Sequence, residues 1–404
     1  MKTKLFLALV IARLTAPAAD FVAHEWGTFT SVQGADGVQL EWNPFITADL
    51  PKFVYDRTRP NSAVPPFVFE TKSSLVSLQR METPVIYFYA DKPTTVDVNV
   101  QFPNGIVTEW YPQRVVMTNG LRSPLRWDKV AIIPPGDAPH PAPLPNDKSK
   151  SHYYAARETD AAMLGVSLND GKTEHEKFLF YRGIGSFQAP LRVTMDPNEA
   201  SIHLHNTGED ELKHFFVLRV KGDRAGLARV NRLEPDKRES VNLIEPRQPL
   251  SEIRMDLARQ MRAALESEGL YPREANAMVE TWRDSWFDEQ GVRVLYILPG
   301  AWTDRILPLL LKPRPKEIVR VMVGRAEVIT PTTEWELMKQ IVRHSQADPA
   351  AVVDFQNLGI GRFADAIVRR MLGRAPSPDF NRAAWGLLET GLRPASAQSE
   401  LAAK

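Results

Sequence analysis

The sequence predicts a mainly β-sandwich N-terminal part followed by an α/β, helix-rich C-terminal part. From Phe21 to about Val230, apolar residues recur mostly at every second position, as they do in half-buried strands. From Ser251 onward the period changes to that of a helix. We therefore expect a β-sandwich domain over 20–233, a linker over 234–250, an α/β helical domain over 251–393 and a tail over 394–404.

The strand pattern is clearest in the first half of the chain. The continuous apolar run Pro84–Tyr89 indicates a strand buried on both faces, and Thr95–Phe102 alternates apolar and polar residues. The turn Pro103-Asn104-Gly105 predicts a hairpin into 106–110, and Asn206-Thr207-Gly208 predicts a second hairpin. Further strands are expected at 177–181, 191–195, 201–205 and 214–220. Roughly eight to ten short strands with proline-rich connections favour a sandwich.

The C-terminal part has helical start and stop signals. Ser251 and Gly269 bracket one expected helix, and Pro272 opens a second that Gly291 ends. Trp282 and Trp286 lie on the apolar face of that second helix, so we expect both in the core. Further helices are expected at 331–344 and 363–372, and strands at 292–298 and 317–329.

Residues 1–19 have the features of a secretory signal peptide. Lys2 and Lys4 precede an apolar run over 5–12, and Ala16-Pro17-Ala18 offers a small-residue cleavage site. The run is shorter than the roughly twenty residues that span a bilayer. An amphipathic N-terminal helix is the alternative. We expect a periplasmic or secreted protein with no transmembrane segment once the signal is removed.

Composition limits the classes of partner and site. The chain has no cysteine, so a metal site would need nitrogen and oxygen ligands. The formal charge is +1, and removal of Lys2, Lys4 and Arg13 gives 1 − 3 = −2 for the mature chain. A protein without a basic field is not expected to bind nucleic acid. The expected partner is a small molecule or glycan.

His24 and Glu25 form the first candidate site, at the start of the predicted mature chain. Both side chains can bind a divalent metal, with His24 as ligand and Glu25 as ligand or general base. Successive residues of a regular strand point to opposite faces, so only a bulge near Gly27 would bring both into one site. The alternative is a hydrogen-bonded core histidine and a glutamate paired with a buried arginine.

A second cluster lies in 151–160, directly after a proline-rich stretch. His152 is a candidate metal ligand or base, Tyr153 a candidate proton donor and Arg157 a candidate clamp for an anion. The alternative is a structural ion-pair network in which Arg157 binds Glu158 or Asp160.

Two further groups of polar residues lie on or beside predicted strands. Glu82 and Arg182 sit at strand ends, and would join His24 and His152 if the fold brings those strands together; Glu82 would then act as ligand or general base. His203 and His205 share one face of a strand and would point to solvent, because Ile202 and Leu204 take the core side. A solvated sheet face is favoured there over a metal site.

These residues lead to two main functional hypotheses. The first is a metal-assisted or acid–base hydrolase, whose cofactor would be a divalent metal held by histidine and carboxylate. The second is a non-catalytic envelope or glycan-binding protein with exposed aromatic side chains, for which Trp42 and Trp110 are the candidates. A third hypothesis is that the protein is a component of a larger assembly. The sequence contains no G-x-S-x-G, H-E-x-x-H, Walker A or EF-hand motif.

The strings HEWGTFT (24–30), METPVIYFY (81–89), HYYAARETDAA (152–162) and FLFYRG (178–183) resemble a group of uncharacterised exported bacterial proteins. So do 269–287 and 319–331. The resemblance implies export and a single composite architecture, and it brings no activity, substrate or cofactor with it.

Overall fold

The computed structural model describes residues 19–43, 50–57, 76–115, 123–137, 143–346, 360–374 and 377–388. All but the last residue of the predicted signal peptide, and the whole predicted tail, lie outside these ranges. Within them, no helix is long and apolar enough to cross a membrane.

An eleven-stranded sheet forms the centre of the molecule, in the order β16-β14-β13-β17-β19-β1-β4-β10-β6-β3, with β2 paired to β1. Its strands are β1 (Ala19–Gly34), β2 (Gln39–Leu40), β3 (Tyr55–Asp56), β4 (Gln79–Ala90), β6 (Gly105–Tyr111), β10 (Leu179–Gly185), β13 (Leu212–Lys221), β14 (Arg224–Leu233), β16 (Gln248–Pro249), β17 (Gly291–Leu298) and β19 (Pro315–Ile329). The long strands β1 and β19 run parallel, and the other pairs are antiparallel.

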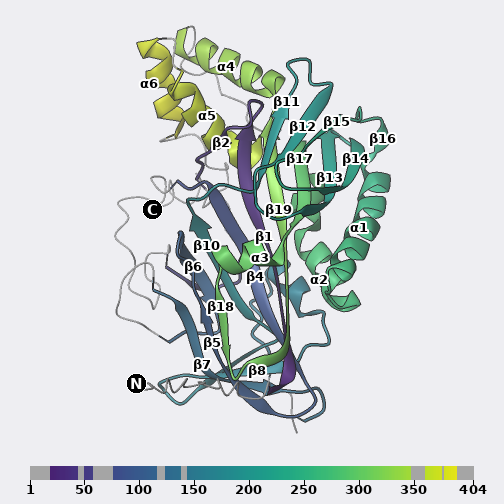
Figure 1. Ribbon diagram of the computed structural model, residues 1–404. Helices are drawn as coiled ribbons and strands as arrows, with labels where there is room; N and C mark the ends of the chain where they lie inside the picture. The colour runs from purple at the N-terminus through teal and green to yellow at the C-terminus, as the bar shows by residue number, and fades with distance from the viewer. Residues whose placement is uncertain are drawn as a thin grey trace, which may run out of the picture.

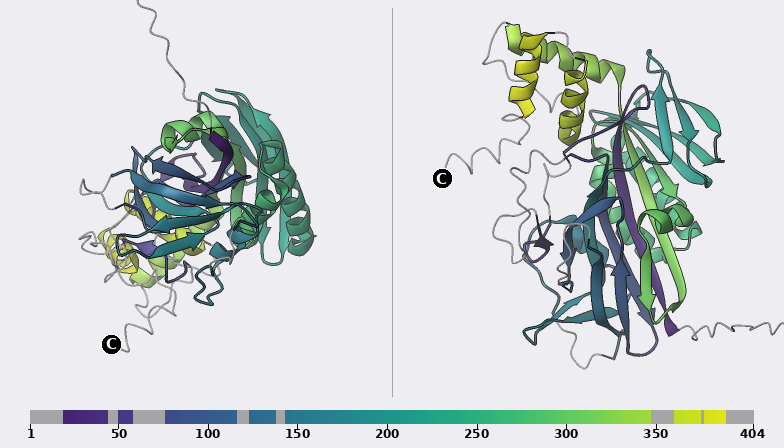
Figure 2. Two further views of the ribbon diagram at one scale, coloured as in Figure 1. Left: turned by 90° about the horizontal axis from the view of Figure 1, so that it is seen from below. Right: turned by 60° about the vertical axis from the view of Figure 1, so that its left-hand side comes forward.

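Two smaller sheets lie against one face of the large sheet (Figures 1 and 2). One has the order β18-β5-β7-β8-β9, and the other the order β11-β12-β15. Their strands are β5 (Thr94–Val100), β7 (Leu125–Ile133), β8 (Met163–Ser167), β9 (Thr173–Glu176), β11 (Leu191–Met195), β12 (Ser201–Asn206), β15 (Arg238–Asn242) and β18 (Leu309–Lys312). Apolar side chains of all three sheets form one buried cluster, to which the short helix α3 (Gly300–Ile306) adds Trp302.

Helices cover the opposite face of the large sheet. These are α1 (Leu250–Ser267), α2 (Pro272–Arg283), the π-helical turn η3 (Asp284–Asp288) that continues α2, and the 3-10 helix η2 (His152–Arg157). Their apolar side chains pack against Trp26, Val85 and Tyr87 of the sheet. Trp282 and Trp286 are both buried here, as predicted from the helical period.

The C-terminal helices form a third unit at one end of the long strands, as Figure 2 shows. The elements are α4 (Pro331–Gln346), η4 (Gly361–Phe363), α5 (Ala364–Leu372) and α6 (Pro378–Gly386). Their core includes Val32, Leu40 and Trp42 from the N-terminal segment and Ile329 from the end of β19. The unit is therefore held by apolar contacts to both long strands.

The prediction of a mainly β fold is confirmed, but both predicted hairpins are wrong. β5 pairs with β18 and β7 in the five-stranded sheet, whereas β6 pairs with β10 and β3 in the large sheet. Likewise β12 lies in the three-stranded sheet and β13 in the large one. In both places the turn carries the chain from one layer to another, and local turn chemistry cannot distinguish this from a return within one sheet.

Strands from both predicted domains enter the same sheet. β17 and β19 belong to the predicted range 251–393, and they lie between β13 and β1 of the range 20–233. The range 234–250, which we expected to be a linker, contains β15 and β16, paired with β12 and β14.

The neighbouring strands β1, β4 and β10 of the large sheet are irregular at adjacent positions. The β1–β4 register shifts between Trp26 and Thr28, and β10 shifts against β4 and β6 next to Gly183. Thr83, inside β4, has φ 52°, which a β-branched residue rarely adopts. Such bulges re-aim side chains and occur beside functional sites.

Gly27→Ala and Gly183→Ala should each destabilise the fold by about 2 kcal/mol or more, the size of other overpacking and strain effects. A Cβ at Gly27 would lie 2.8 Å from Pro84 Cα, and one at Gly183 would lie 2.5 Å from the Ile106 carbonyl oxygen. Backbone atoms at these distances cannot move aside cheaply. Urea unfolding measures the loss. Gly300→Ala is the control, because its Cβ meets no atom within 4 Å, and equal stability of all three variants would contradict the account.

Candidate functional site

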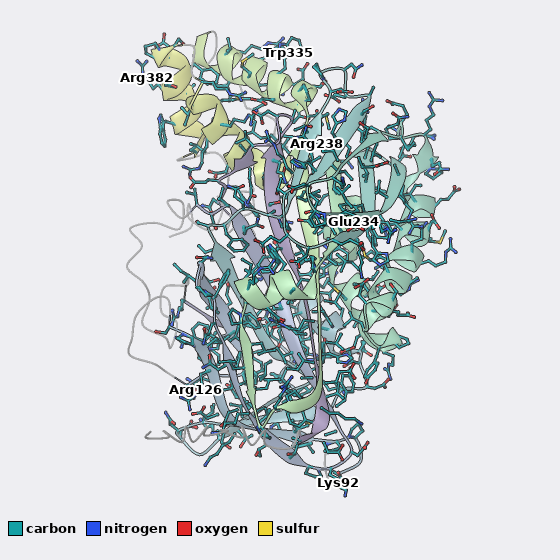
Figure 3. The ribbon with its side chains drawn as sticks, viewed as in Figure 1. Lys92, Arg126, Glu234, Arg238, Trp335 and Arg382 are labelled. Carbon is teal, nitrogen blue, oxygen red and sulfur yellow. The ribbon has the colours of Figure 1, made fainter. Side chains whose placement is uncertain are left out.

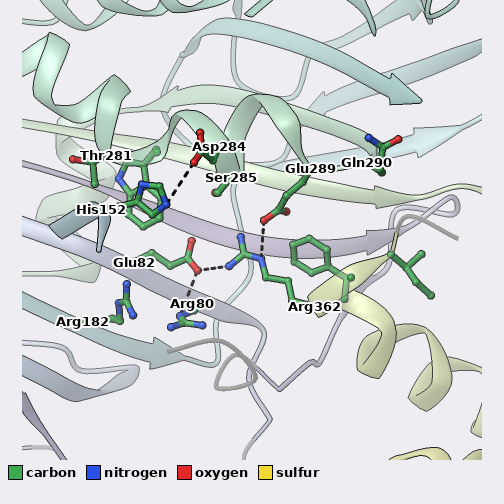
Figure 4. A pocket seen from close by; sticks show the side chains of 14 residues that line it. Arg80, Glu82, His152, Arg182, Thr281, Asp284, Ser285, Glu289, Gln290 and Arg362 are labelled. Atoms are coloured by element: carbon green, nitrogen blue, oxygen red, sulfur yellow. Dashed lines mark hydrogen bonds and ion pairs between the residues drawn. The ribbon is translucent and has the colours of Figure 1, made fainter. Parts of the chain in front are cut away.

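The irregular level of the sheet forms one wall of an open pocket of about 510 Å³. The opposite wall comes from the end of α2 and the turn η3, and η4 of the C-terminal unit closes one side (Figure 4). The lining residues are Arg80, Glu82, His152, Arg182, Thr281, Trp282, Asp284, Ser285, Glu289, Gln290, Ile360, Gly361, Arg362 and Phe363. We call this the arginine pocket. Its volume is within the usual range for small-molecule sites.

The bulge in β4 explains why charged side chains face this pocket. Arg80 and Glu82 lie two positions apart on one face, and Val85 and Tyr87 pack against the helices on that same face. In a regular strand, residues 82 and 85 would point to opposite faces. The extra residue at Thr83-Pro84 turns residues 82 and 85 to the same face. The polar end of the strand therefore faces the pocket.

Glu82 is the centre of the charged wall. Its Oε1 lies 2.6 Å from Arg362 Nη1 and 3.4 Å from Arg80 Nε, and its Oε2 accepts a hydrogen bond from the Thr30 hydroxyl at 2.9 Å. Burial opposes its ionisation, but the positive charges of Arg362, Arg80 and Arg182 outweigh burial and hold the carboxyl pKa at about 2. Glu82 is therefore a fixed anion and a poor general base at neutral pH.

Three arginine side chains gather on this side of the pocket, and their charge is balanced by the carboxylates of Glu82, of Glu109 nearby and of Glu289 across the pocket. The guanidinium groups of Arg80, Arg182 and Arg362 surround the Glu82 carboxylate, and Arg80 is almost fully buried. Burial, together with the charge of Arg182, lowers the pKa of Arg80 to about 10. Mutual repulsion of this kind is relieved when an anion approaches. Guanidinium forks match carboxylate and phosphate groups.

The opposite rim offers neutral and acidic polar groups. His152 Nε2 lies 3.7 Å from Asp284 Oδ2, and both side chains are about half exposed, at 42% and 55%. Ser285 and Gln290 follow on and beyond the π-helical turn. Turns of this type are frequent at functional sites.

Several predicted site residues come together in this pocket and others do not. Glu82, Arg182 and His152 line it. His24 instead binds Glu274 through Nδ1 at 2.6 Å, and Glu274 also accepts the Tyr271 N–H that begins α2. Glu274 and Asp284, the partners of the two histidines, are ten positions apart along α2 and η3, which corresponds to about 15 Å of helix.

Glu25 lies on the other face of the sheet from His24, as the strand period predicts. It accepts the Tyr181 hydroxyl at 2.5 Å and pairs with Arg320 Nη2 at 2.5 Å. Both side chains of this ion pair are nearly buried. The bulge next to Gly27 therefore does not bring His24 and Glu25 into one site.

Tyr153 and Arg157 form a separate buried cluster around Glu176. Arg157 Nη2 lies 2.6 Å from the Glu176 carboxylate, which also accepts the Tyr153 hydroxyl at 3.0 Å. The alternative of a structural ion pair is therefore observed, with Glu176 and not Glu158 or Asp160 as the partner. Burial and the Glu176 charge raise the pKa of Tyr153 well above its usual value, so this phenol keeps its proton.

The other candidate residues, His203 and the two tryptophans, lie outside the arginine pocket. His203 Nε2 lies 2.9 Å from Asp196 and its Nδ1 lies 2.6 Å from the Ser240 hydroxyl, on the outer face of β12. Within the described ranges, no three histidine, aspartate or glutamate side chains are placed to hold a metal. Trp42 and Trp110, the candidate sugar-binding tryptophans, are buried. Trp335 is exposed instead, at the outer surface of α4 (Figure 3).

Several residues that line the pocket were not predicted from the sequence. Arg80, Asp284 and Arg362 belong to no recognisable motif, and Trp282 was assigned only to the core. One signal in the sequence could have pointed to Arg80. Arg80 and Glu82 lie two positions apart beside an apolar run, so both charges fall on one face of the strand and must be paired there.

Comparison with known proteins adds no assignment. No family model and no curated protein matches the chain. Among solved structures, the yeast delta-COP-I mu-homology domain complexed with a Dsl1 WxWxV peptide matches with a TM-score of 0.31 at 7% identity, covering 78% of this chain and 100% of that chain. The same yeast domain without the peptide matches with a TM-score of 0.29 at 7% identity and the same coverage. Likenesses this weak support no conclusion about fold family or function.

Stability should fall as the pH drops from about 4.5 toward 2, because the pKa of Glu82 is about 2 in the fold against an ordinary value of 4.5. This depressed pKa corresponds to roughly 3 kcal/mol of stability that is present above pH 4.5 and lost below it. Urea unfolding between pH 7 and pH 3 measures the trend. In Glu82→Gln this part of the pH dependence should disappear, whereas Glu252→Gln, at an exposed site on α1, should behave as the wild type. A constant stability gap between wild type and Glu82→Gln would contradict the assignment.

Proposed function

We propose that this chain is an exported protein that binds a small organic anion in the arginine pocket. Export rests on the N-terminal sequence alone. The binding site would be carried by a sandwich-like β framework with a helix-rich C-terminal part. The observation that supports the site best is the gathering of three guanidinium groups, those of Arg80, Arg182 and Arg362, in the lining of one pocket.

The shape and chemistry of the pocket favour an acidic ligand with a polar body. Arginine forks would hold its carboxylate or phosphate, and the groups on the opposite rim would accept or donate hydrogen bonds to hydroxyls. Phe363 and Trp282 add apolar surface between the two ends. This combination suits an acidic sugar or another hydroxylated acid better than a neutral glycan.

Acid–base hydrolysis of such a ligand is the second candidate function. His152 and Asp284 face each other at the rim, and an imidazole supported by a carboxylate is a common proton-transfer group. A metal-assisted reaction receives less support. Glu82 is saturated by Arg362, Arg80 and Thr30, and His24 lies under α2.

Binding is tested by titrating the mature protein, residues 20–404, with D-glucuronate, citrate and phosphate against D-glucose. We expect the acidic probes to raise the melting temperature and glucose to leave it unchanged. Arg182→Gln should weaken binding in calorimetry by about 10- to 100-fold, the usual size for a lost charge-assisted hydrogen bond.

Arg126→Gln is the matched control, because Arg126 lies on β7 with its side chain 45% exposed. Equal stabilisation by glucose and glucuronate, or unchanged affinity in Arg182→Gln, would overturn the proposal.

The second candidate is tested with 4-nitrophenyl phosphate and 4-nitrophenyl β-D-glucuronide. If His152 transfers the proton, His152→Asn should lower nitrophenol release by at least about 100-fold, the lower range for a lost acid–base group. Its affinity for glucuronate should stay within about twofold of wild type, since the arginines remain. Turnover of neither ester by the wild type would remove the hydrolase hypothesis and leave the binding proposal standing.

A further inference from the structure

Arg362 belongs to the C-terminal helical unit, yet its side chain is part of the wall of the arginine pocket. Nη1 lies 2.6 Å from Glu82 on β4, and Nε lies 3.7 Å from Glu289, just after η3. Figure 4 shows the guanidinium between these two carboxylates. Only 11% of the side chain is exposed. Arg362 therefore connects two walls of the pocket that come from different elements.

The surroundings of Arg362 hold it firmly. Its guanidinium lies 4.9 Å from the Phe363 ring and 5.7 Å from the Trp42 ring, and Arg325 lies on the Phe363 ring at 5.2 Å. Glu289, its second partner, is also bound by Arg325 at 2.5 Å. The chain of alternating charges thus runs from β4 through η4 to β19.

Two nitrogens of Arg362, Nε and Nη2, make no hydrogen bond within the described residues, and of these only Nε has a nearby carboxylate, Glu289 at 3.7 Å. Nη2 is buried and donates to no group in the described part of the chain. A buried donor without an acceptor destabilises the protein. The natural acceptor is an oxygen of a ligand in the pocket, because both neighbouring carboxylates already bind other nitrogens.

We propose that Arg362 is the residue that selects for the ligand's negative charge, and that the bound ligand in turn fastens the C-terminal helical unit. This inference rests on the proposed function. An anion contacts Arg362 only when η4 is docked, so binding and docking must favour each other by the same factor. The pocket is then incomplete without the C-terminal unit.

Hydrogen exchange of the full mature protein, with and without ligand, tests the inference. Without ligand, Arg362→Gln should speed exchange over 364–372 at least about tenfold, since one arm of a buried charge pair is removed. Arg374→Gln, on the same unit but 56% exposed and paired with Asp36 and Glu334, should have little effect. Arg362→Lys keeps the charge but loses the fork, and should fall between the two.

With a saturating probe that raises the melting temperature, exchange over 364–372 should slow in the wild type and not in Arg362→Gln. Discrimination between glucuronate and glucose should also shrink in that variant. Probe binding without any change over 364–372 would overturn the linkage and leave anion binding intact. Failure of every acidic probe to bind would refute the proposed function, and the linkage with it. Exchange in ligand-free Arg362→Gln equal to wild type would show that Arg362 fastens nothing.

Discussion

The parallel pairing of β1 with β19 is the constraint on which the rest of the molecule depends. It runs from Ala19 opposite Pro315 to Gly34 opposite Ile329, and it joins segments almost 300 residues apart. The two smaller sheets pack on one face of the large sheet that this pair centres, α1 and α2 pack on its other face, and the C-terminal helices pack at the far end of the pair. Because β19 ends one half of the strand order and β1 begins the other, loss of this pairing would divide the sheet on which the layers pack.

The arginine pocket is a consequence of what happens beside those strands. A regular sheet would bury apolar residues continuously under α2. The bulge that places Gly27 opposite Thr83 and Pro84, and the irregularity next to Gly183, interrupt that pattern, so charged side chains reach the helix-covered face without entering the apolar core. A π-helical turn and η4 complete the enclosure. The strained backbone at Thr83 and the crowded arginines both destabilise the protein. They occur together at a place where a bound ligand would offset that cost.

Local patterns predicted much of the secondary structure and little of its assembly. The helices beginning near Ser251 and Pro272 and the strand at Pro84–Tyr89 follow from period and capping, which act over a few residues. The alternation of side chains along a strand also predicted that His24 and Glu25 point to opposite faces. The turns at 103–105 and 206–208 were misassigned because a turn has the same local chemistry whether the chain returns in one sheet or crosses between two. Of the four residues that we expected to meet, Glu82, Arg182 and His152 line the pocket and His24 does not. Arg362 reaches the pocket by long-range packing that no spacing in the sequence encodes.

A crystal of the mature protein soaked in selenate would show whether the arginine pocket binds an oxyanion, because the anomalous signal locates selenate without a model of the ligand. We expect a selenate peak in the arginine pocket, within hydrogen-bonding distance of Arg182 or Arg362. Selenate bound only at surface arginines such as Arg126, with the pocket holding a cation or no oxyanion at all, would contradict it.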